Sequence, residues 1–261
     1  HFPYLWCLTH TKNILHFQVP FKFGNGKTLA NKLKLSRFNH VVCNSNFTKK
    51  CIDESFGISS EVLYPPVDVE NFKPGKKENI ILGVGRFFAP MHPKKQEEMV
   101  QAFIKMKSDW QLVLIGGVTG KESMKSVQQL KKLAIGHKIK IITDSSLDVL
   151  KEYYSKAKLF WHAAGFGEDL DNHPERAEHF GITTVEAMAA GCVPIVFAGG
   201  GQIEIVNEKN GFLWKTIDEL ESKTQQLILD NILMSKLSKQ AIFDAKNFSK
   251  EKFYEKLEKI I

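Results

Sequence analysis

The sequence lacks long hydrophobic runs and has few cysteines. None of its apolar stretches approaches the ~20 residues that a membrane-spanning helix needs. Hydrophobic residues still make up 43% of the 261 positions, which is enough for a globular core. The cysteines form no C-x-x-C pair, which excludes a disulfide framework or a cysteine-rich metal site and predicts reduced thiols in a cytoplasmic protein. The four are Cys7, Cys43, Cys51 and Cys192.

Acidic residues are in the minority. Lysine and arginine number 36 against 29 aspartates and glutamates, a net charge of +7, with lysines densest at residues 32–37, 73–77 and 236–252. Solvated helix faces would account for this pattern. The alternative is attraction to nucleotides or to an anionic membrane surface. No segment interleaves basic and aromatic residues on one face, so we expect no nucleic-acid partner.

Several catalytic patterns are also missing. No serine, histidine and aspartate stand in a hydrolase order. Residues 83–88 (GVGRFF) lack the third glycine of a dinucleotide-binding fingerprint, which argues against an NAD-dependent oxidoreductase. Histidine and carboxylate side chains are frequent between residues 169 and 179, but their spacing matches no standard ligand pattern, so we expect no metal site.

From residue 79 onward, short apolar strands alternate with helices. The expected strands are 80–84, 111–115, 138–142, 158–162 and 193–197, and the expected helices are 94–107, 121–135, 146–157 and 181–190. This alternation predicts an α/β fold with a Rossmann-like, doubly wound parallel sheet. Before it, we expect a strand at 39–44, a helix from 46 to 56 that stops at Gly57, and a strand at 60–64. Residues 216–261 are expected to form two or three helical segments.

The most informative stretch is residues 178–191 (EHFGITTVEAMAAG). It places Glu178 and Glu186, with seven residues between them, around a glycine turn that opens a helix. A second glycine turn, residues 199–201, follows the buried strand 193–197. Glycines at the start of a helix suit phosphate binding through backbone N–H groups and the helix dipole. Carboxylates would repel phosphate but suit hydroxyls, so the combination favours a sugar nucleotide.

This Glu-x7-Glu segment, with its trailing Gly-Gly-x-x-Glu, resembles the donor-site signature of retaining glycosyltransferases of the GT-B type, glycosyltransferase family 4 (group 1). Further motifs match in the family's order over roughly residues 40–215. They are residues 44–48 (NSNFT), 64–68 (YPPVD), 84–87 (VGRF) with 94–96 (KKQ), and 210–213 (NGFL). Any one of them alone would be weak.

The resemblance implies a domain organisation. Residues 1–66 would be the remaining part of an N-terminal acceptor domain, 67–77 a linker, and 78–247 the donor-binding domain. Residues 248–261 would form a C-terminal helix that returns to the acceptor domain. Because the family places a whole acceptor domain first and the sequence begins His1-Phe2-Pro3, we expect it to be truncated.

The resemblance also implies roles for named residues. Arg86 and Lys94, with Lys95 as the close alternative, would stabilise the leaving diphosphate, and Glu178 would contact the donor sugar. The intervening Pro90 to Pro93 segment lengthens the arginine–lysine spacing. Glu186 would bind ribose hydroxyls. The remaining expected donor contacts are Gly85, Phe180, Gly181, Ile182, Gly200, Gly201 and Gln202. Glu204 is expected to cap the next helix turn. His162, at a strand end, is a further candidate, although such histidines are more often core residues.

The implied function is transfer of a sugar from a GDP- or UDP-linked donor to a glycan or lipid-linked acceptor, with retention of configuration and without a metal or other cofactor. The enzyme would be cytoplasmic or peripheral at the cytosolic face of a membrane. Two alternatives remain open: a nucleotide-binding fragment without catalysis, and a sugar-nucleotide epimerase of the same architecture. The sequence does not fix the base, the sugar or the acceptor.

Overall fold

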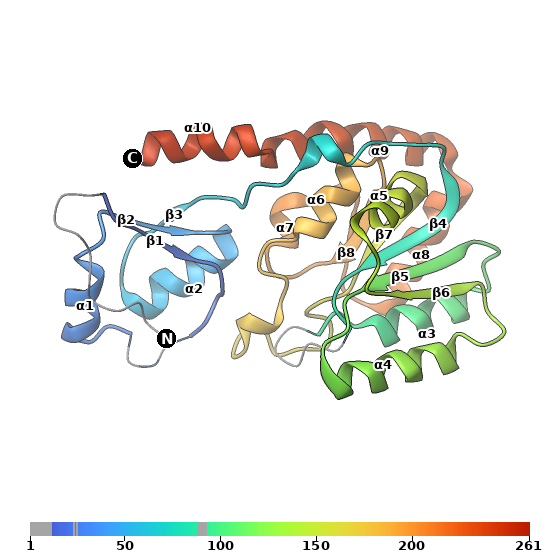
Figure 1. Cartoon of the computed structure of the whole chain (residues 1–261), viewed down its shortest axis with the longest axis horizontal. Coiled ribbons are helices and arrows are strands. Elements are labelled where there is room, and N and C mark those ends of the chain that lie inside the picture. The colour runs from blue at the N-terminus through green and yellow to red at the C-terminus, as the bar shows by residue number, and fades with distance from the viewer. Residues whose placement is uncertain (1–11, 23, 25, 88–92) are drawn as a thin grey trace.

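The computed structural model describes residues 12–22, 24, 26–87 and 93–261, and within them the chain forms two units, each built on a parallel sheet (Figure 1). The N-terminal unit has a three-stranded sheet in the order β1-β2-β3. Its elements are β1 (Ile14–Phe17), α1 (Leu29–Leu35), β2 (His40–Cys43), α2 (Asn46–Phe56) and β3 (Glu61–Val62). The sequence predicted β2, α2 and β3 but neither β1 nor α1. Cys7 lies outside the described residues.

The two ends of α2 explain why its bounds were predictable. The Ser45 hydroxyl accepts a hydrogen bond from the Thr48 amide at the N-terminus. At the other end Gly57 adopts φ 66°, a left-handed conformation that glycine takes without a steric penalty.

The C-terminal unit has a six-stranded parallel sheet in the order β6-β5-β4-β7-β8-β9. The predicted α/β fold is therefore confirmed. Its strands are β4 (Glu78–Val84), β5 (Gln111–Gly116), β6 (Ile139–Thr143), β7 (Ala157–His162), β8 (Val193–Phe197) and β9 (Phe212–Trp214). Its helices are α3 (Gln96–Met106), α4 (Gly120–Leu133), α5 (Leu147–Lys156), α6 (Ile182–Ala189), α7 (Gln202–Ile205), α8 (Ile217–Leu229) and α9 (Asn231–Ala245). Short 3-10 turns lie at η1 (Val69–Asn71), η2 (Pro174–Arg176) and η3 (Lys246–Phe248).

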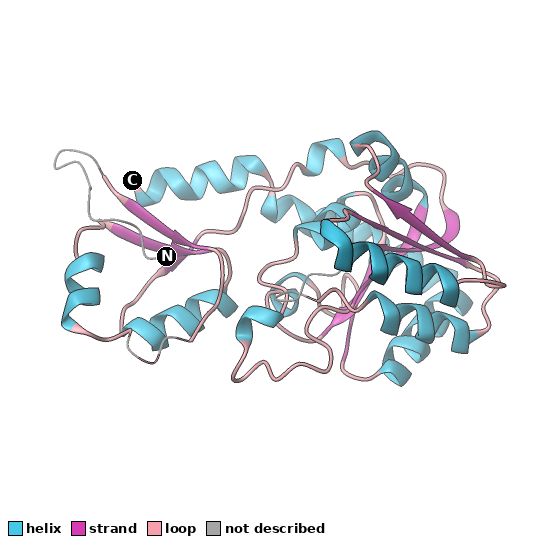
Figure 2. Cartoon of the chain, turned by 60° about the horizontal axis from the view of Figure 1, so that its bottom comes forward, coloured by secondary structure: helices cyan, strands magenta, loops and turns pink. Residues whose placement is uncertain are grey.

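Both faces of this sheet are covered (Figures 1 and 2). Side chains of α3, α4 and α8 pack with one face around the fully buried Trp161 and Trp214. Side chains of α5 and α6 pack with the other around Tyr154 and Phe160, and α9 contributes to both clusters. Strands buried on both faces are apolar throughout, which is why their bounds could be read from sequence.

The expected helix at 94–107 begins two residues later than predicted. Lys95 precedes α3 with φ 55°, so Lys94 and Lys95 belong to the connection before the helix and not to its first turn. Residues 88–92, including Pro90, Met91 and His92 of the lengthened connection, lie outside the described residues.

The chain crosses between the units twice, along the same side of the molecule (Figures 1 and 2). The first crossing is the segment after β3. It ends at Lys77, whose Nζ donates to the carbonyls of Ala157 (2.7 Å) and Ala190 (2.6 Å). The second is the helix α10 (Lys250–Ile260), which follows α9 and η3. Its Ile260 packs with Val42 and Leu63 of the N-terminal unit.

Candidate functional site

A cavity of about 580 Å³ lies between the two units, beside the carboxyl end of β4. This is the edge at which open α/β sheets bind ligands. Its lining comes from two connections of the C-terminal unit, one after β4 and one that leads into α6, and from three segments on the N-terminal side. The lining residues are Gln18, Asn44, Pro65, Val84, Gly85, Arg86, Lys94, Glu178, His179, Phe180, Gly181, Ile182 and Thr183. Seven of the residues singled out from the sequence therefore meet at one cavity.

Two cations face this cavity from the connection between β4 and α3. Arg86 is exposed, directly after Gly85. The close approach of the two segments requires the glycine, because a Cβ on Gly85 would lie 2.9 Å from Cγ of Lys94. The side chain of Gln96 fixes this connection by donating to the backbone carbonyls of Gly85 (3.2 Å) and Arg86 (3.0 Å).

Lys94 pairs with Glu178. Its Nζ lies 2.6 Å from Oε2 of Glu178, and both side chains are about one-sixth exposed (17% and 16%). Burial by itself would raise the pKa of Glu178, but the Lys94 ammonium and the neighbouring His162 outweigh it and hold the pKa well below its usual value. The site thus presents an ionised carboxylate next to a cation.

His162, the last residue of β7, lies against the same carboxylate. Its Nε2 is 2.9 Å from Oε2 of Glu178. Burial lowers the pKa of His162, so its ring is neutral at pH 7. The structure therefore places His162 beside Glu178, within the site and not in the core alone.

The N-terminus of α6 also faces the cavity. Gly181 precedes the helix with φ 122°, and Phe180, Gly181 and Ile182 all line the cavity. The first N–H groups of a helix have no partner within it and carry partial positive charge. This end of α6 therefore adds to the positive potential of Arg86 and Lys94.

Lys95, the alternative to Lys94, turns away from the cavity. Its Nζ lies 2.7 Å from Glu168, which Arg176 also contacts at 2.9 Å. The neighbouring lysines thus hold two carboxylates of the same long connection between β7 and α6. Only Lys94 of the two is placed to meet a ligand in the cavity.

The second glycine turn does not line the cavity but packs beneath it. Gly201 donates its N–H to the carbonyl of Glu178 at 2.7 Å, and a Cβ on Gly200 would overlap that same carbonyl. The Gln202 amide is buried and donates to Thr184 at 3.0 Å. In this structure the three residues support the connection that carries Glu178, and their contact with a nucleotide stays a prediction.

Glu186 lies one helical turn deeper than the cavity lining. The Tyr154 hydroxyl donates to its Oε2 at 2.9 Å. Burial raises the pKa of Glu186 to about 7. Its expected contact with ribose is not tested by this geometry.

Sequence reasoning missed the wall contributed by the N-terminal side. Asn44 donates from Nδ2 to the Gln18 carbonyl at 2.9 Å, and Pro65 completes this wall. The motifs 44–48 and 64–68 contain Asn44 and Pro65, but nothing in the sequence marks Gln18. His179 of the C-terminal unit contacts this wall, because its Nδ1 lies 3.1 Å from the carbonyl oxygen of Gln18.

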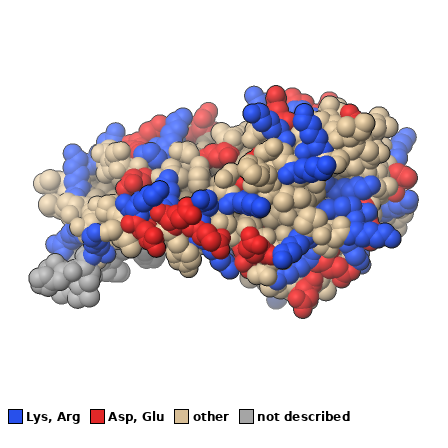
Figure 3. Space-filling model, turned by 90° about the horizontal axis from the view of Figure 1, so that it is seen from above, with Lys and Arg blue, Asp and Glu red and all other residues tan. Residues whose placement is uncertain are grey.

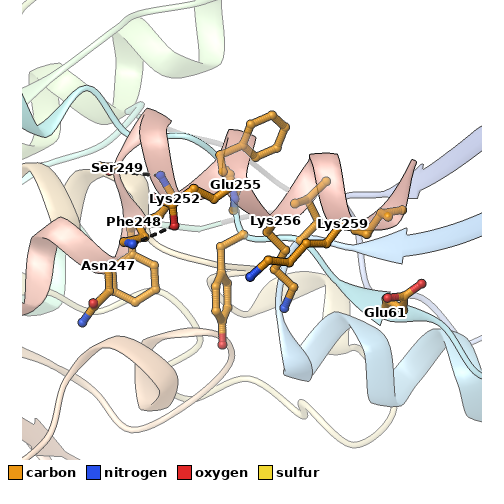
Figure 4. A pocket seen from close by; sticks show the side chains of 13 residues that line it. Glu61, Asn247, Phe248, Ser249, Lys252, Glu255, Lys256 and Lys259 are labelled. Carbon is orange, nitrogen blue, oxygen red and sulfur yellow. Dashed lines mark hydrogen bonds and ion pairs between the residues drawn. The ribbon is translucent and has the colours of Figure 1, made fainter.

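A second cavity, of about 520 Å³, lies between α10 and the segment after β3. Figure 4 shows Lys256 and Lys259 on α10 and Glu61 on β3. Pro65 lines both cavities. The second cavity is therefore part of the joint between the units.

Among the described residues, no group of three or more histidine, cysteine or carboxylate side chains is arranged to hold a metal ion. Within the same residues, no helix combines the length and the apolar character needed to span a bilayer.

Two units with parallel sheets, joined by two crossings around a cavity with cations at a strand end and a helix N-terminus, define a GT-B type α/β protein. The family model for glycosyl transferases group 1 matches residues 67–243. The chain belongs to this family, and the resemblance to group 1 glycosyltransferases read from its motifs is confirmed.

Curated relatives share modest identity. The chain is 28% identical over 220 residues to a Dictyostelium discoideum "GDP-Man:Man(3)GlcNAc(2)-PP-Dol alpha-1,2-mannosyltransferase", covering 77% of this chain and 41% of that protein. It is 27% identical to the Homo sapiens protein of the same description, covering 82% and 46%. The chain therefore spans less than half the length of these relatives.

Solved structures share the fold. A glycosyltransferase from Rickettsia africae superposes with a TM-score of 0.77 at 20% identity, over 95% of this chain and 69% of that one. Anabaena HepE in complex with UDP and glucose gives 0.75 at 17% identity, over 94% and 70%.

Proposed function

We propose that the chain carries the donor site of a retaining hexosyltransferase that moves a sugar from a nucleoside-diphosphate sugar to a lipid-linked glycan. The observation that supports this most is the meeting of Arg86, Lys94 and the N-terminus of α6 around one cavity, with the Glu178 carboxylate at its edge. Donor diphosphate would bind the cations, and a sugar hydroxyl would bind the carboxylate.

In this proposal, negative charge develops on the leaving diphosphate as the glycosidic bond breaks. Arg86 and Lys94 are already in place to stabilise it, and preorganised cations lower such a barrier by several kcal/mol (about 3 for one well-placed donor). We propose that they, together with the helix dipole, serve in place of a metal ion. Undiminished turnover in the presence of EDTA would support this, whereas complete loss that Mg²⁺ restores would contradict it.

For the donor we propose GDP-mannose, because the curated relatives named above are described as GDP-Man-dependent. The acceptor would be a glycan on a lipid carrier, and we propose peripheral contact with an anionic membrane surface. The face bearing α9 and α10 mixes lysine and arginine with acidic side chains (Figure 3). Flotation with anionic liposomes at low salt tests this contact. If the protein did not float with the liposomes, the proposed membrane contact would be wrong.

Calorimetric titration of the chain with GDP, UDP, ADP and NAD tests the donor site. We expect saturable binding of GDP, weaker binding of the other diphosphates and none of NAD. Tighter binding of UDP than of GDP would support the donor site but assign it a uridine nucleotide. No binding of any of the four would contradict the proposal.

The second candidate is a nucleotide-binding unit without catalysis. Binding of GDP without any transfer of mannose from GDP-mannose would support this candidate. No observation in the structure favours the epimerase.

A further inference from the structure

One carboxylate of the C-terminal unit is held almost entirely by the N-terminal unit. Glu204, on α7, accepts hydrogen bonds from the backbone amides of Asn46 (2.9 Å) and Phe47 (2.8 Å). It also accepts from Nδ2 of Asn46 at 2.9 Å and from the Tyr64 hydroxyl at 3.0 Å. Figure 1 shows α7 on the side of its unit that faces α2. Glu204 was expected to cap its own helix turn, and it caps a helix of the other unit instead.

The contact completes the N-terminus of α2. The first four amides of a helix lack partners within it. The Ser45 hydroxyl accepts from the amide of Thr48, at the third position of the helix. Glu204 accepts from the amides at the first two positions, Asn46 and Phe47. A carboxylate at this end is also favoured by the helix dipole, and hydrogen bonds to an ionised acceptor are stronger than neutral ones.

Tyr64 extends this contact to the cavity. Burial, followed by the Glu204 charge, raises the pKa of Tyr64 to about 12, so the hydroxyl remains a donor. The Tyr64 ring packs against Phe180, with ring centroids 5.5 Å apart, and against Phe248 at 5.2 Å. Phe180 lines the cavity on the donor side.

The capped end of α2 also leads directly into the opposite wall of the cavity. Asn44 lines the cavity and precedes the capping residue Ser45, and its side chain holds the Gln18 carbonyl. The position of this wall relative to Lys94 and Glu178 therefore depends on how α2 is held against the C-terminal unit.

We propose that Glu204 is a positioning residue that fixes the acceptor-side wall of the cavity against the donor site. It acts through the amides of α2 and through Tyr64, without touching the donor. The inference rests on the proposed function for its effect on transfer, but its structural part is independent of any substrate.

The substrate-free test is amide hydrogen exchange at Asn46 and Phe47 in Glu204→Ala, Glu204→Gln and wild type. Removing the carboxylate should speed exchange of these two amides about tenfold or more, which is the loss of one charge-assisted hydrogen bond each. Glu204→Gln keeps the shape of the side chain but only one accepting oxygen, so its exchange rates should lie between those of Glu204→Ala and wild type. The control is Glu208→Gln, an exposed glutamate four residues further on, which should exchange like wild type.

The functional test measures sugar transfer from GDP-mannose with the same variants. We expect the affinity for GDP and the KM for the donor to stay within about twofold, while kcat for transfer falls about tenfold or more. Tyr64→Phe, which removes one of the four donors, should show a smaller fall in the same direction.

Three results would overturn the inference. Exchange at Asn46 and Phe47 unchanged in Glu204→Ala would mean that the carboxylate does not hold α2. Loss of GDP affinity as large as in Arg86→Ala would place Glu204 in the donor site. Faster exchange with wild-type kcat would mean that the contact does not position the wall. If no nucleotide binds even the wild type, the exchange result still stands and the proposed function is what has failed.

Discussion

The ammonium of Lys94 lies 2.6 Å from the carboxylate of Glu178, although 84 residues separate them in the chain. The pair joins the connection after β4 to the connection before α6, the two segments that carry the expected diphosphate and sugar contacts. The carboxylate of the cavity is thus paired with one of its cations.

Breaking this pair should cost stability. Lys94→Met leaves Glu178 largely buried without its partner, and we expect a loss of about 2 kcal/mol in unfolding free energy at pH 7 after allowing for partial solvent screening. Adding Glu178→Gln should recover much of it. Denaturant unfolding of the two single variants and the double variant measures the coupling, and strictly additive losses would contradict it.

The same ion pair predicts how the folding stability depends on pH in the acid range. The pKa of Glu178 is lower in the folded state than in the unfolded state. The ionised carboxylate therefore stabilises the fold fully above the unfolded pKa of about 4.3, and this stabilisation is lost as the pH falls through the lower folded pKa. Wild type should therefore lose stability more steeply on acidification than Glu178→Gln. Parallel curves for the two proteins would show that the pair contributes nothing.

Arg86→Ala should weaken diphosphates more than nucleosides. Arg86 lines the cavity where the diphosphate is expected, so we predict a loss of about tenfold in GDP affinity and little change for guanosine. Lys95→Met is the matched control, because Lys95 contacts Glu168 instead of the cavity. Equal losses for GDP and guanosine would mean that Arg86 does not contact phosphate.

Glu186→Gln should stabilise the protein at alkaline pH. The folded pKa of about 7 lies above the unfolded value, so the cost of ionising Glu186 grows between about pH 4.3 and 7 and is complete above that range. We expect Glu186→Gln to gain about 3 kcal/mol relative to wild type between pH 4 and pH 8.5. Unfolding at both pH values measures this, with the exposed Glu70→Gln as control. A constant difference would mean that Glu186 titrates normally.

Lys77→Met should destabilise the junction between the first crossing and the sheet. Lys77 is half-buried and donates to the carbonyls of Ala157 and Ala190, so its loss removes a charged donor from both carbonyls and should cost about 2 kcal/mol. The neighbouring Lys76→Met removes an exposed lysine and should have almost no effect. Equal unfolding midpoints for the two variants would rule out this role.

The strands and helices of the C-terminal unit were predictable because each is marked by local signals. Buried strands such as β8 are continuous apolar runs, and α5 begins one residue after the predicted start, with Ser146 as its N-cap. By contrast, β1 is a four-residue strand with only Phe17 buried, too short and too exposed to give a pattern.

For the site, the motifs identified the residues but not their partners. The sequence could not distinguish Lys94 from Lys95, because the choice depends on the left-handed conformation of Lys95 and on Glu168, 73 residues away. It assigned Glu204 to its own turn because the actual partners, the amides at the start of α2, lie 157 and 158 residues earlier. Contacts across the cavity depend on how two units pack, which no local pattern records.

Both crossings run along one side of the molecule, so any rotation of one unit against the other would turn about this side, where the Tyr64 and Phe248 rings are already in contact. The gap between the units then widens most at the edge farthest from the crossings and least beside Pro65, which lies within one of them. Bulky substrates would enter and leave through that far edge, and a cross-link placed there would close the entrance, whereas one placed near Pro65 would leave it open.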